Sequence, residues 1–286
     1  MSAKPLLSAS WRAVNRMIRE HFTGTAAELA YYGLLSAVPC VAAFVGILGL
    51  IGSHPATTEA VDTIVRDGGG SVDVAGVAAD AARGVVESNG SAGLALGAGL
   101  VTTLWVASVY LAAFQRAAYR VHDKDPIAAW RARPLQLLLT FVSLVLLAVT
   151  ALALVATKAI VTAIGEAVGA EDATVTIWSI GRWLLALAVI VIMIAALFDL
   201  APRDDGQRRK LISAGSLAAV LAWLLASAGF EIWVDNFASY DATYGALAGV
   251  IAFAVWLWIS NLALLFGLIL DLELYESRRS SAASTS

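Results

Sequence analysis

The sequence predicts an all-α protein, a polytopic transmembrane helix bundle of six spans with both termini in the cytoplasm. The first observation is composition: 59% of the 286 residues are hydrophobic and 14% are charged, with a mean hydropathy of +0.78. Soluble domains contain about 25% charged residues. The second is a series of long apolar stretches, each able to cross a hydrocarbon core of about 30 Å. The third is the uneven distribution of lysine and arginine between the connections, which sets orientation.

Residues 1–25 are predicted to form a cytoplasmic leader with an interfacial helix. Trp11, Arg12, Arg16 and Arg19 recur at roughly helical spacing. Trp11, with Met17 or Ile18, would face lipid while the arginines reach anionic headgroups. An ordinary solvated helix is the alternative interpretation.

Residues 26–276 are predicted to form the transmembrane domain. The approximate spans are 29–51, 91–115, 134–157, 175–198, 211–230 and 242–270. The fourth span has the shortest uncharged core, 183–198, and Ala173–Gly181 extends it on the outer side. Arg182 is then the only charged residue within the fourth span, and its long side chain would extend to the membrane interface.

The basic residues alternate in density along the chain. Fifteen of the 19 lysines and arginines fall in the leader, in 116–133, in 199–210 and in the tail. Because basic connections remain in the cytoplasm, these four regions are predicted to be cytoplasmic.

The remaining connections and the tail carry weaker signals. The outer connection, about 53–89, has apolar residues at spacings of three to four on either side of Gly68-Gly69-Gly70. This pattern predicts two short amphipathic helices. The final residues, 277–286, are predicted to be a disordered cytoplasmic tail.

Polar side chains within the spans are candidate functional residues, because a charge at mid-membrane costs roughly 2.5–3.5 kcal/mol on insertion scales. Glu28 would hold a cation or proton in a cavity, or lie at headgroup level. Asn261 is expected to hydrogen-bond to a neighbouring helix. Asp271 and Glu273 are expected to be solvated at the cytoplasmic face. The candidates for a polar cavity within the membrane are Glu28, Tyr31, Tyr32, Ser36, Pro39, Asn261 and Asp271.

Pro39 is predicted to kink the first span because it removes one backbone hydrogen bond. Ser36 or Tyr32, about one turn earlier, could satisfy the released carbonyl. The kink would line a cavity beside Tyr31, or would serve packing alone.

Signatures of catalysis are absent. His21, His54 and His122 fall in separate polar regions, and Cys40 is the only cysteine. We therefore expect no metal, no cofactor, no catalytic residue and no nucleic-acid partner, and the lipid bilayer is the expected partner. Pairs of glycines four residues apart, Gly93 with Gly97 and Gly245 with Gly249, predict close helix packing.

Two end motifs resemble those of the YihY/BrkB family of bacterial inner-membrane proteins. The run from Ala26 to Pro39 (AAELAYYGLLSAVP) resembles the family's first-span motif. The run from Ser239 to Leu247 (SYDATYGAL) is similar to the motif before its last span. The motif residues there are Ser239, Tyr240, Asp241, Thr243, Tyr244 and Gly245. Further similar positions are Trp105, Ala107, Ser108, Trp130, Arg131, Trp256, Trp258, Gly267, Glu273 and Arg278, so the resemblance covers nearly the whole chain.

The chain departs from the family near the end of the last span. Family members commonly have Gly-Ala-Glu-Leu-Asn where this chain has GLILD, from Gly267 to Asp271. Ile269 therefore replaces the embedded glutamate, and Asp271 is the candidate substitute for any proton or ion role.

The resemblance implies a multi-pass protein of the bacterial plasma membrane. Members are associated with virulence, serum resistance or envelope-lipid export. Some were formerly labelled ribonuclease BN, but this sequence has no metal-ligand cluster, no paired base and nucleophile and no basic-aromatic RNA platform. A ribonuclease is thus the least supported of three interpretations.

The favoured interpretation is a transport-related role in moving a lipid or small solute. The alternative is a non-transporting membrane scaffold or envelope-integrity factor. The scaffold predicts a dry bundle interior, with Glu28 and Asn261 paired to protein groups. The sequence does not predict the substrate, the energy coupling or the oligomeric state.

Overall fold

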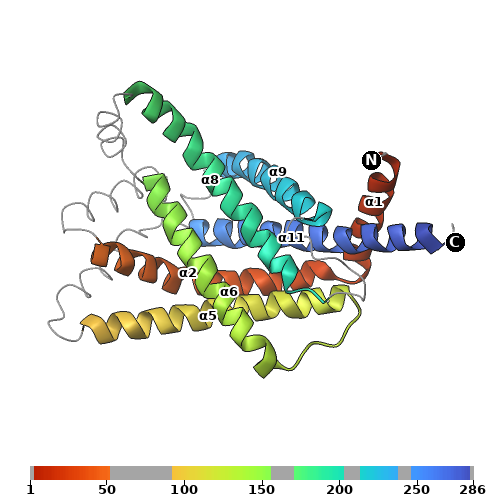
Figure 1. Cartoon of the computed structure of the whole chain (residues 1–286), viewed down its shortest axis with the longest axis horizontal. Coiled ribbons are helices and arrows are strands. Elements are labelled where there is room, and N and C mark those ends of the chain that lie inside the picture. The colour runs from red at the N-terminus through yellow and green to blue at the C-terminus, as the bar shows by residue number, and fades with distance from the viewer. Residues whose placement is uncertain (1–2, 52–91, 156–170, 203–212, 238–245, 284–286) are drawn as a thin grey trace. The chain divides into compact units, whose positions relative to one another are not determined.

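The described part of the chain is entirely helical. The structure is a computed structural model, and it describes residues 3–51, 92–155, 171–202, 213–237 and 246–283. Within these ranges it contains seven α-helices and no strand (Figure 1). The helices are α1 (Ala3–Arg19), α2 (Phe22–Ile51), α5 (Ala92–Val121), α6 (Ala129–Val155), α8 (Glu171–Asp199), α9 (Ala214–Phe237) and α11 (Ala246–Ala283). The all-α fold class is thereby confirmed.

Three of the described helices contain segments long and apolar enough to cross a membrane. These segments are Ala129–Leu147 in α6, Ala214–Val234 in α9 and Leu247–Ser280 in α11. The other predicted spans fall on α2, α5 and α8. Six membrane crossings therefore remain a prediction.

The helices extend beyond the predicted spans at several ends. Helix α2 begins at Phe22, inside the predicted leader, and α6 begins at Ala129 rather than at Pro134. Hydropathy marks only the apolar part of a helix, whereas the hydrogen-bonded backbone continues into the polar ends. The predicted outer helices at 53–89 lie outside the described residues.

Two helices have a residue with a left-handed backbone conformation at the end that the predicted topology places on the cytoplasmic side. His21 has φ 56° between α1 and α2, and Asp123 has φ 49° after α5. At the end of α5, the amide of Lys124 donates to Tyr119 O and that of Asp123 donates to Arg120 O. This is the Schellman pattern, which satisfies free carbonyls at a helix end. It fixes the direction in which the α5–α6 connection leaves.

The prediction of a disordered tail over 277–286 is wrong for residues 277–283, which continue α11. The hydroxyl of Ser277 donates to Leu274 O, and that of Ser280 donates to Ser277 O. These bonds return the serine side chains to the helix, so a run of small polar residues does not end it. Residues 284–286 lie outside the described residues.

The chain divides into two compact units. One comprises Met1–Val38, Trp105–Leu137 and Val191–Ser286, and the other comprises Pro39–Leu104 and Leu138–Ile190. The first unit has a core of large side chains that are fully buried. These are Phe22, Leu29, Phe114, Val121, Leu265 and Ile269. In the second unit, many described side chains are apolar and exposed, including Phe141, Val145 and Trp183.

Helices α9 and α11 pack closely in the first unit. A methyl group on Gly215 would collide with Gly267 O and with Asp271, and one on Gly267 would lie 2.5 Å from Ala219 Cβ. Small residues four apart thus let the two backbones approach. The sequence predicted close helix packing from pairs of glycines four residues apart. Gly215 and Ala219 on α9 form a comparable pair of small residues with the same spacing. Of the glycines in the predicted pairs, Gly93 and Gly97 fall within α5 and Gly249 falls within α11, whereas Gly245 lies outside the described residues.

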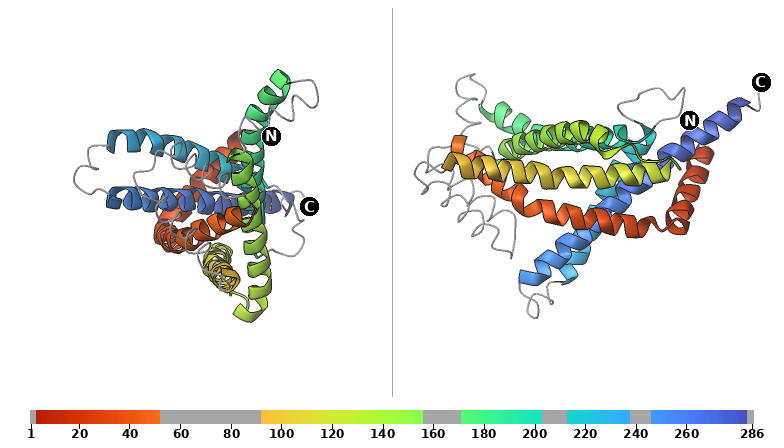
Figure 2. Two further views of the ribbon diagram at one scale, coloured as in Figure 1. Left: turned by 90° about the vertical axis from the view of Figure 1, so that its left-hand side faces the viewer. Right: turned by 90° about the horizontal axis from the view of Figure 1, so that it is seen from below.

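Helix α1 packs on the C-terminal part of α11 (Figures 1 and 2). Ala9 and Ala13 are buried. Leu7, Trp11, Val14 and Ile18 are exposed and recur every three to four residues. At 100° per residue these four side chains share one face, and the two alanines lie on the opposite face. Helix α1 therefore packs one apolar face against α11, and its second apolar face remains exposed.

Candidate ligand cavity between helices α5 and α6

A cavity with arginine and glutamine side chains in a mainly apolar lining lies in the first unit where α5, the α5–α6 connection and the start of α6 meet. Its volume is about 300 Å³. Its lining residues are Ala112, Gln115, Arg116, Tyr119, Pro126, Ile127, Ala129, Ala132, Arg133 and Gln136. Two arginines and no acidic residue are among them, so the lining carries positive charge.

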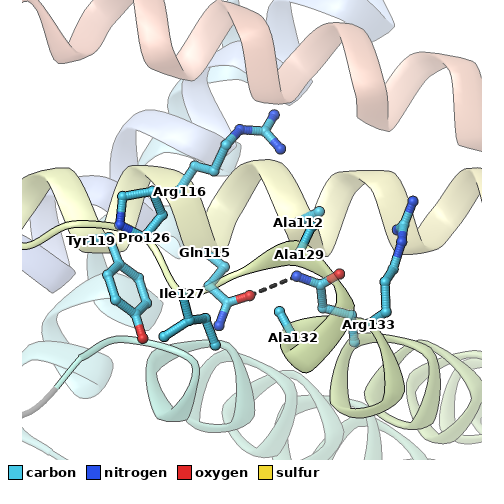
Figure 3. Close-up of a pocket in the computed structure, with 10 residues that line it drawn as sticks. Ala112, Gln115, Arg116, Tyr119, Pro126, Ile127, Ala129, Ala132 and Arg133 are labelled. Carbon is cyan, nitrogen blue, oxygen red and sulfur yellow. Dashed lines mark hydrogen bonds between the residues drawn. The ribbon is translucent and has the colours of Figure 1, made fainter.

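Two glutamines join the helices at the cavity. Gln136 Nε2 donates to Gln115 Oε1 across 2.6 Å, and both side chains are buried (Figure 3). Burying amides in an apolar bundle is costly unless they hydrogen-bond, so the pair fixes the register of α5 against α6. Gln115 is only 7% exposed, and no described atom accepts a hydrogen bond from its amide nitrogen. That nitrogen retains donor capacity at the cavity wall.

The two arginines have different partners. Arg116 Nη2 lies 3.1 Å from Glu28 Oε1, and both side chains are about half exposed. Arg133 Nη1 donates to Ser108 Oγ across 3.2 Å, and its Cζ lies 4.7 Å from the centre of the Trp105 ring. No carboxylate within the described ranges pairs with Arg133. In Figure 3 the two arginine side chains extend in the same direction, on either side of the glutamine pair, and Tyr119 points the other way.

Glu28 is thus an ion-pair partner rather than an isolated carboxylate. An ion pair between exposed side chains contributes about 0–1 kcal/mol, so its partner Arg116 can exchange one anion for another at small cost. Arg120 Nη1 donates to Thr25 Oγ1 nearby and forms a second link between α5 and α2.

Asn261 hydrogen-bonds to another helix, as expected from its depth in the last span. Tyr110 Oη donates to Asn261 Oδ1 across 2.8 Å, and Asn261 Nδ2 donates to Leu257 O. Asn261 is 2% exposed. The carbonyl and the amide of this side chain therefore both have partners within the protein.

Asp271 caps helix α9. The amide of Gly215 donates to Asp271 Oδ1 across 3.1 Å, and Ser213 and Ser216 exchange backbone and hydroxyl hydrogen bonds at the same helix start. These contacts satisfy amides that a helix leaves free in its first turn. Ile269 is fully buried. Residues two apart on a helix do not share a face, so Asp271 does not occupy the position of the family glutamate.

The expectation that Glu273 is solvated is wrong. Its side chain is 12% exposed, and Oε2 lies 2.7 Å from Arg12 Nε. The leader arginines are likewise not free for headgroups. Arg16, whose side chain is 15% exposed, binds Glu20, Asp123 and Val121 O. Burial opposes the positive charge of Arg16, but Glu20, Asp123 and Glu276 outweigh it and raise the pKa of the guanidinium.

Among the described residues, Tyr31, Tyr32 and Ser36 do not line this cavity. Tyr31 and Tyr32 lie edge to face, with ring centres 5.6 Å apart, and Tyr31 is exposed. Ser36 donates to Gly33 O rather than to the carbonyl that Pro39 releases. Pro39 lies within the continuous α2, and its side chain is outside the described set. The motif residues Ser239, Tyr240, Asp241, Thr243, Tyr244 and Gly245 lie outside the described residues.

Sequence reasoning missed the cavity residues. It used Arg116 and Arg133 only to orient the chain, and it did not single out Gln115 or Gln136. A signal was present: each glutamine lies at the border of an apolar stretch, where buried polar groups need partners. The sequence could not show that the two borders meet.

Comparison with known proteins identifies the family. A family model described as virulence factor BrkB matches residues 13–286. The chain belongs to this family. The Bacillus subtilis (strain 168) protein YfkH, which is named a ribonuclease-like protein, is 28% identical to this BrkB-family protein over 248 residues. That match covers 84% of the chain and 86% of YfkH.

Other relatives of the BrkB-family protein are named membrane proteins. The UPF0761 membrane protein VSAL_I2938 of Aliivibrio salmonicida (strain LFI1238) is 28% identical over 92% of this chain and 81% of its own length. PSHAa0171 of Pseudoalteromonas translucida (strain TAC 125), also UPF0761, is 25% identical over 89% and 81%. No solved structure matches the chain. With the apolar helices, these relatives identify a membrane protein of the BrkB family.

Proposed function

We propose that this BrkB-family protein spans the bacterial plasma membrane six times, with both termini in the cytoplasm, and has a transport-related role. In this proposal it moves a lipid or a small solute. The basic connections support the orientation, since 116–133 includes five of the 19 basic residues and supplies most of the residues that line the cavity. The cavity would then open toward the cytoplasm.

The observation that carries the proposal is the charged cavity at the end of apolar helices. Two arginines and a pair of buried glutamines are expensive to place beside a hydrocarbon core. A cavity of about 300 Å³ is large enough for a headgroup or a small solute. A chain that served only as an anchor would gain nothing from placing these polar side chains around a cavity.

Helix α1 is proposed to lie in the headgroup layer of the cytoplasmic leaflet. It carries basic residues and no acidic residue, and Trp11 lies within its exposed apolar face. That face, rather than the arginines, would contact lipid, because Arg12 and Arg16 already bind protein carboxylates.

A second candidate is the non-transporting scaffold, and two observations favour it. Glu28 pairs with Arg116, and Asn261 pairs with Tyr110. Paired polar groups are what a dry bundle interior requires. In either case we propose that the protein is not an enzyme, and a purified sample is expected to leave RNA intact.

A flux assay in proteoliposomes separates the two candidates. Protein reconstituted with fluorescent phospholipids, or with a trapped anionic solute, is expected to accelerate movement across the bilayer. Arg133→Gln should slow that movement, and Arg131→Gln should not, because Arg131 lies over the Trp130 ring and does not line the cavity. Movement no faster than in protein-free liposomes would contradict the transport role and retain the scaffold as the candidate function.

A further inference from the structure

We propose that the cavity between α5 and α6 binds a phosphate group, either on a lipid headgroup or as a free phosphate. The inference deepens the proposed function, because it names the chemistry that the cavity recognises. It requires binding alone and does not require that the bound molecule be moved.

The charge at the cavity fits an anion. Arg133 has a hydroxyl and an aromatic ring as its described partners, and no described carboxylate neutralises it. Arg116 is paired with Glu28 through side chains that are half exposed, so water already competes for the pair. Guanidinium groups donate several parallel N–H bonds, a geometry that matches phosphate oxygens.

Uncharged hydrogen-bond donors at the cavity wall add to the two arginines. The Gln115 amide nitrogen is buried at the cavity and has no described acceptor. A buried donor without an acceptor costs free energy that a ligand oxygen would recover. Helix α6 begins at Ala129, a lining residue, and its first amides add positive potential. An anion would therefore meet charge from the arginines and hydrogen bonds from the wall.

The cavity geometry also selects among anions. The arginines lie on either side of the glutamine pair (Figure 3), so a ligand that contacts both must present oxygens that are spread apart. A tetrahedral phosphate does so, whereas a planar carboxylate presents both oxygens on one edge. Ile127 and Pro126 line the side of the connection and would contact an apolar portion of the ligand.

Calorimetric titration of the full-length protein in nanodiscs of zwitterionic lipid tests the proposal. The probes are inorganic phosphate, dihexanoyl phosphatidic acid, and dihexanoyl phosphatidylcholine as the headgroup control. We expect phosphatidic acid, phosphate or both to bind more tightly than phosphatidylcholine. Binding of phosphatidic acid alone would identify a lipid as the source, and binding of inorganic phosphate would identify a free solute.

Matched variants locate the binding. Arg133→Gln and Arg116→Gln should each weaken binding about tenfold or more, because each removes a charge-assisted contact. Arg131→Gln removes the same charge two residues away and should retain the affinity. Equal losses in Arg131→Gln and Arg133→Gln, or no binding of either phosphate probe, would overturn the inference.

The flux assay keeps the two proposals distinguishable. Phosphate binding that depends on Arg133, without lipid or solute movement, would retain this inference and refute transport. Movement of lipid or solute without binding of either phosphate probe would do the reverse.

Discussion

At the scale of single residues, the polar side chains of the first unit are held by specific partners. Tyr110 with Asn261, Gln115 with Gln136, and Arg12 with Glu273 each link segments that are distant in the sequence. In an apolar bundle such pairs specify which helices meet, since hydrocarbon contacts alone discriminate poorly between faces.

Removing the Tyr110–Asn261 hydrogen bond is expected to reduce stability modestly. A double-mutant cycle of Tyr110→Phe and Asn261→Leu should give a coupling free energy of about 0.6–1.7 kcal/mol, the range for hydrogen bonds between membrane helices. Reversible unfolding in mixed micelles measures it. Strictly additive effects of the two substitutions would show that the bond contributes nothing.

Gly267 should tolerate no side chain. Gly267→Ala is expected to cost about 1–3 kcal/mol, because the new methyl group would press on Gly215 O and Ala219 and the backbone would have to move apart. Gly229→Ala is the control in α9, where a Cβ meets nothing within 4 Å. It should be neutral or stabilise by up to about 1 kcal/mol through helix propensity. Equal unfolding midpoints for the two variants would contradict this packing.

At the scale of helices, periodicity and hydropathy were enough to predict helices α1, α2, α5, α6, α8, α9 and α11. Their ends were not predictable in the same way. The ends of α1 and α5 depend on left-handed conformations at His21 and Asp123. His and Asp adopt this geometry more often than most residues, but both are also common elsewhere, so neither identifies a helix end by itself. The extension of α11 depends on serine side chains that return to the helix.

The candidate site was predictable only in part. Asn261 was identified because an amide deep in an apolar stretch needs a partner. Arg133 was not, because a basic residue at the cytoplasmic border is already explained by topology. Which border residues converge is a property of tertiary packing, and a single sequence does not contain that information directly.

Arg16 is expected to hold α1 against the α5–α6 connection. Arg16→Gln removes charge-assisted contacts to Glu20 and Asp123, whose carboxylates are 39% and 84% exposed, so each contact contributes about 0–1 kcal/mol. Amide hydrogen exchange across α1 should therefore become a few-fold faster. Arg19→Gln, an exposed position on the same helix, should leave the exchange unchanged. If both variants behave alike, Arg16 is not the link.

At the scale of the whole molecule, orientation in the membrane is the prediction on which the others depend. In a Cys40→Ala background, Asp125→Cys should resist a membrane-impermeant thiol reagent in intact cells, and Ser71→Cys should react. After lysis both should react. Labelling of Asp125→Cys in intact cells would place the cavity on the outer side and invert the proposed topology.

The docking of α1 on α11 links the two ends of the chain, since Arg12 and Glu273 are 261 positions apart in the sequence. A chain emerging from the ribosome makes α1 first and its docking partner last. Helix α1 must therefore remain undocked until α11 has been synthesised. A polypeptide that stops short of α11 keeps Ala9 and Ala13 uncovered, so truncation before α11 changes the surface of a helix far from the point of truncation.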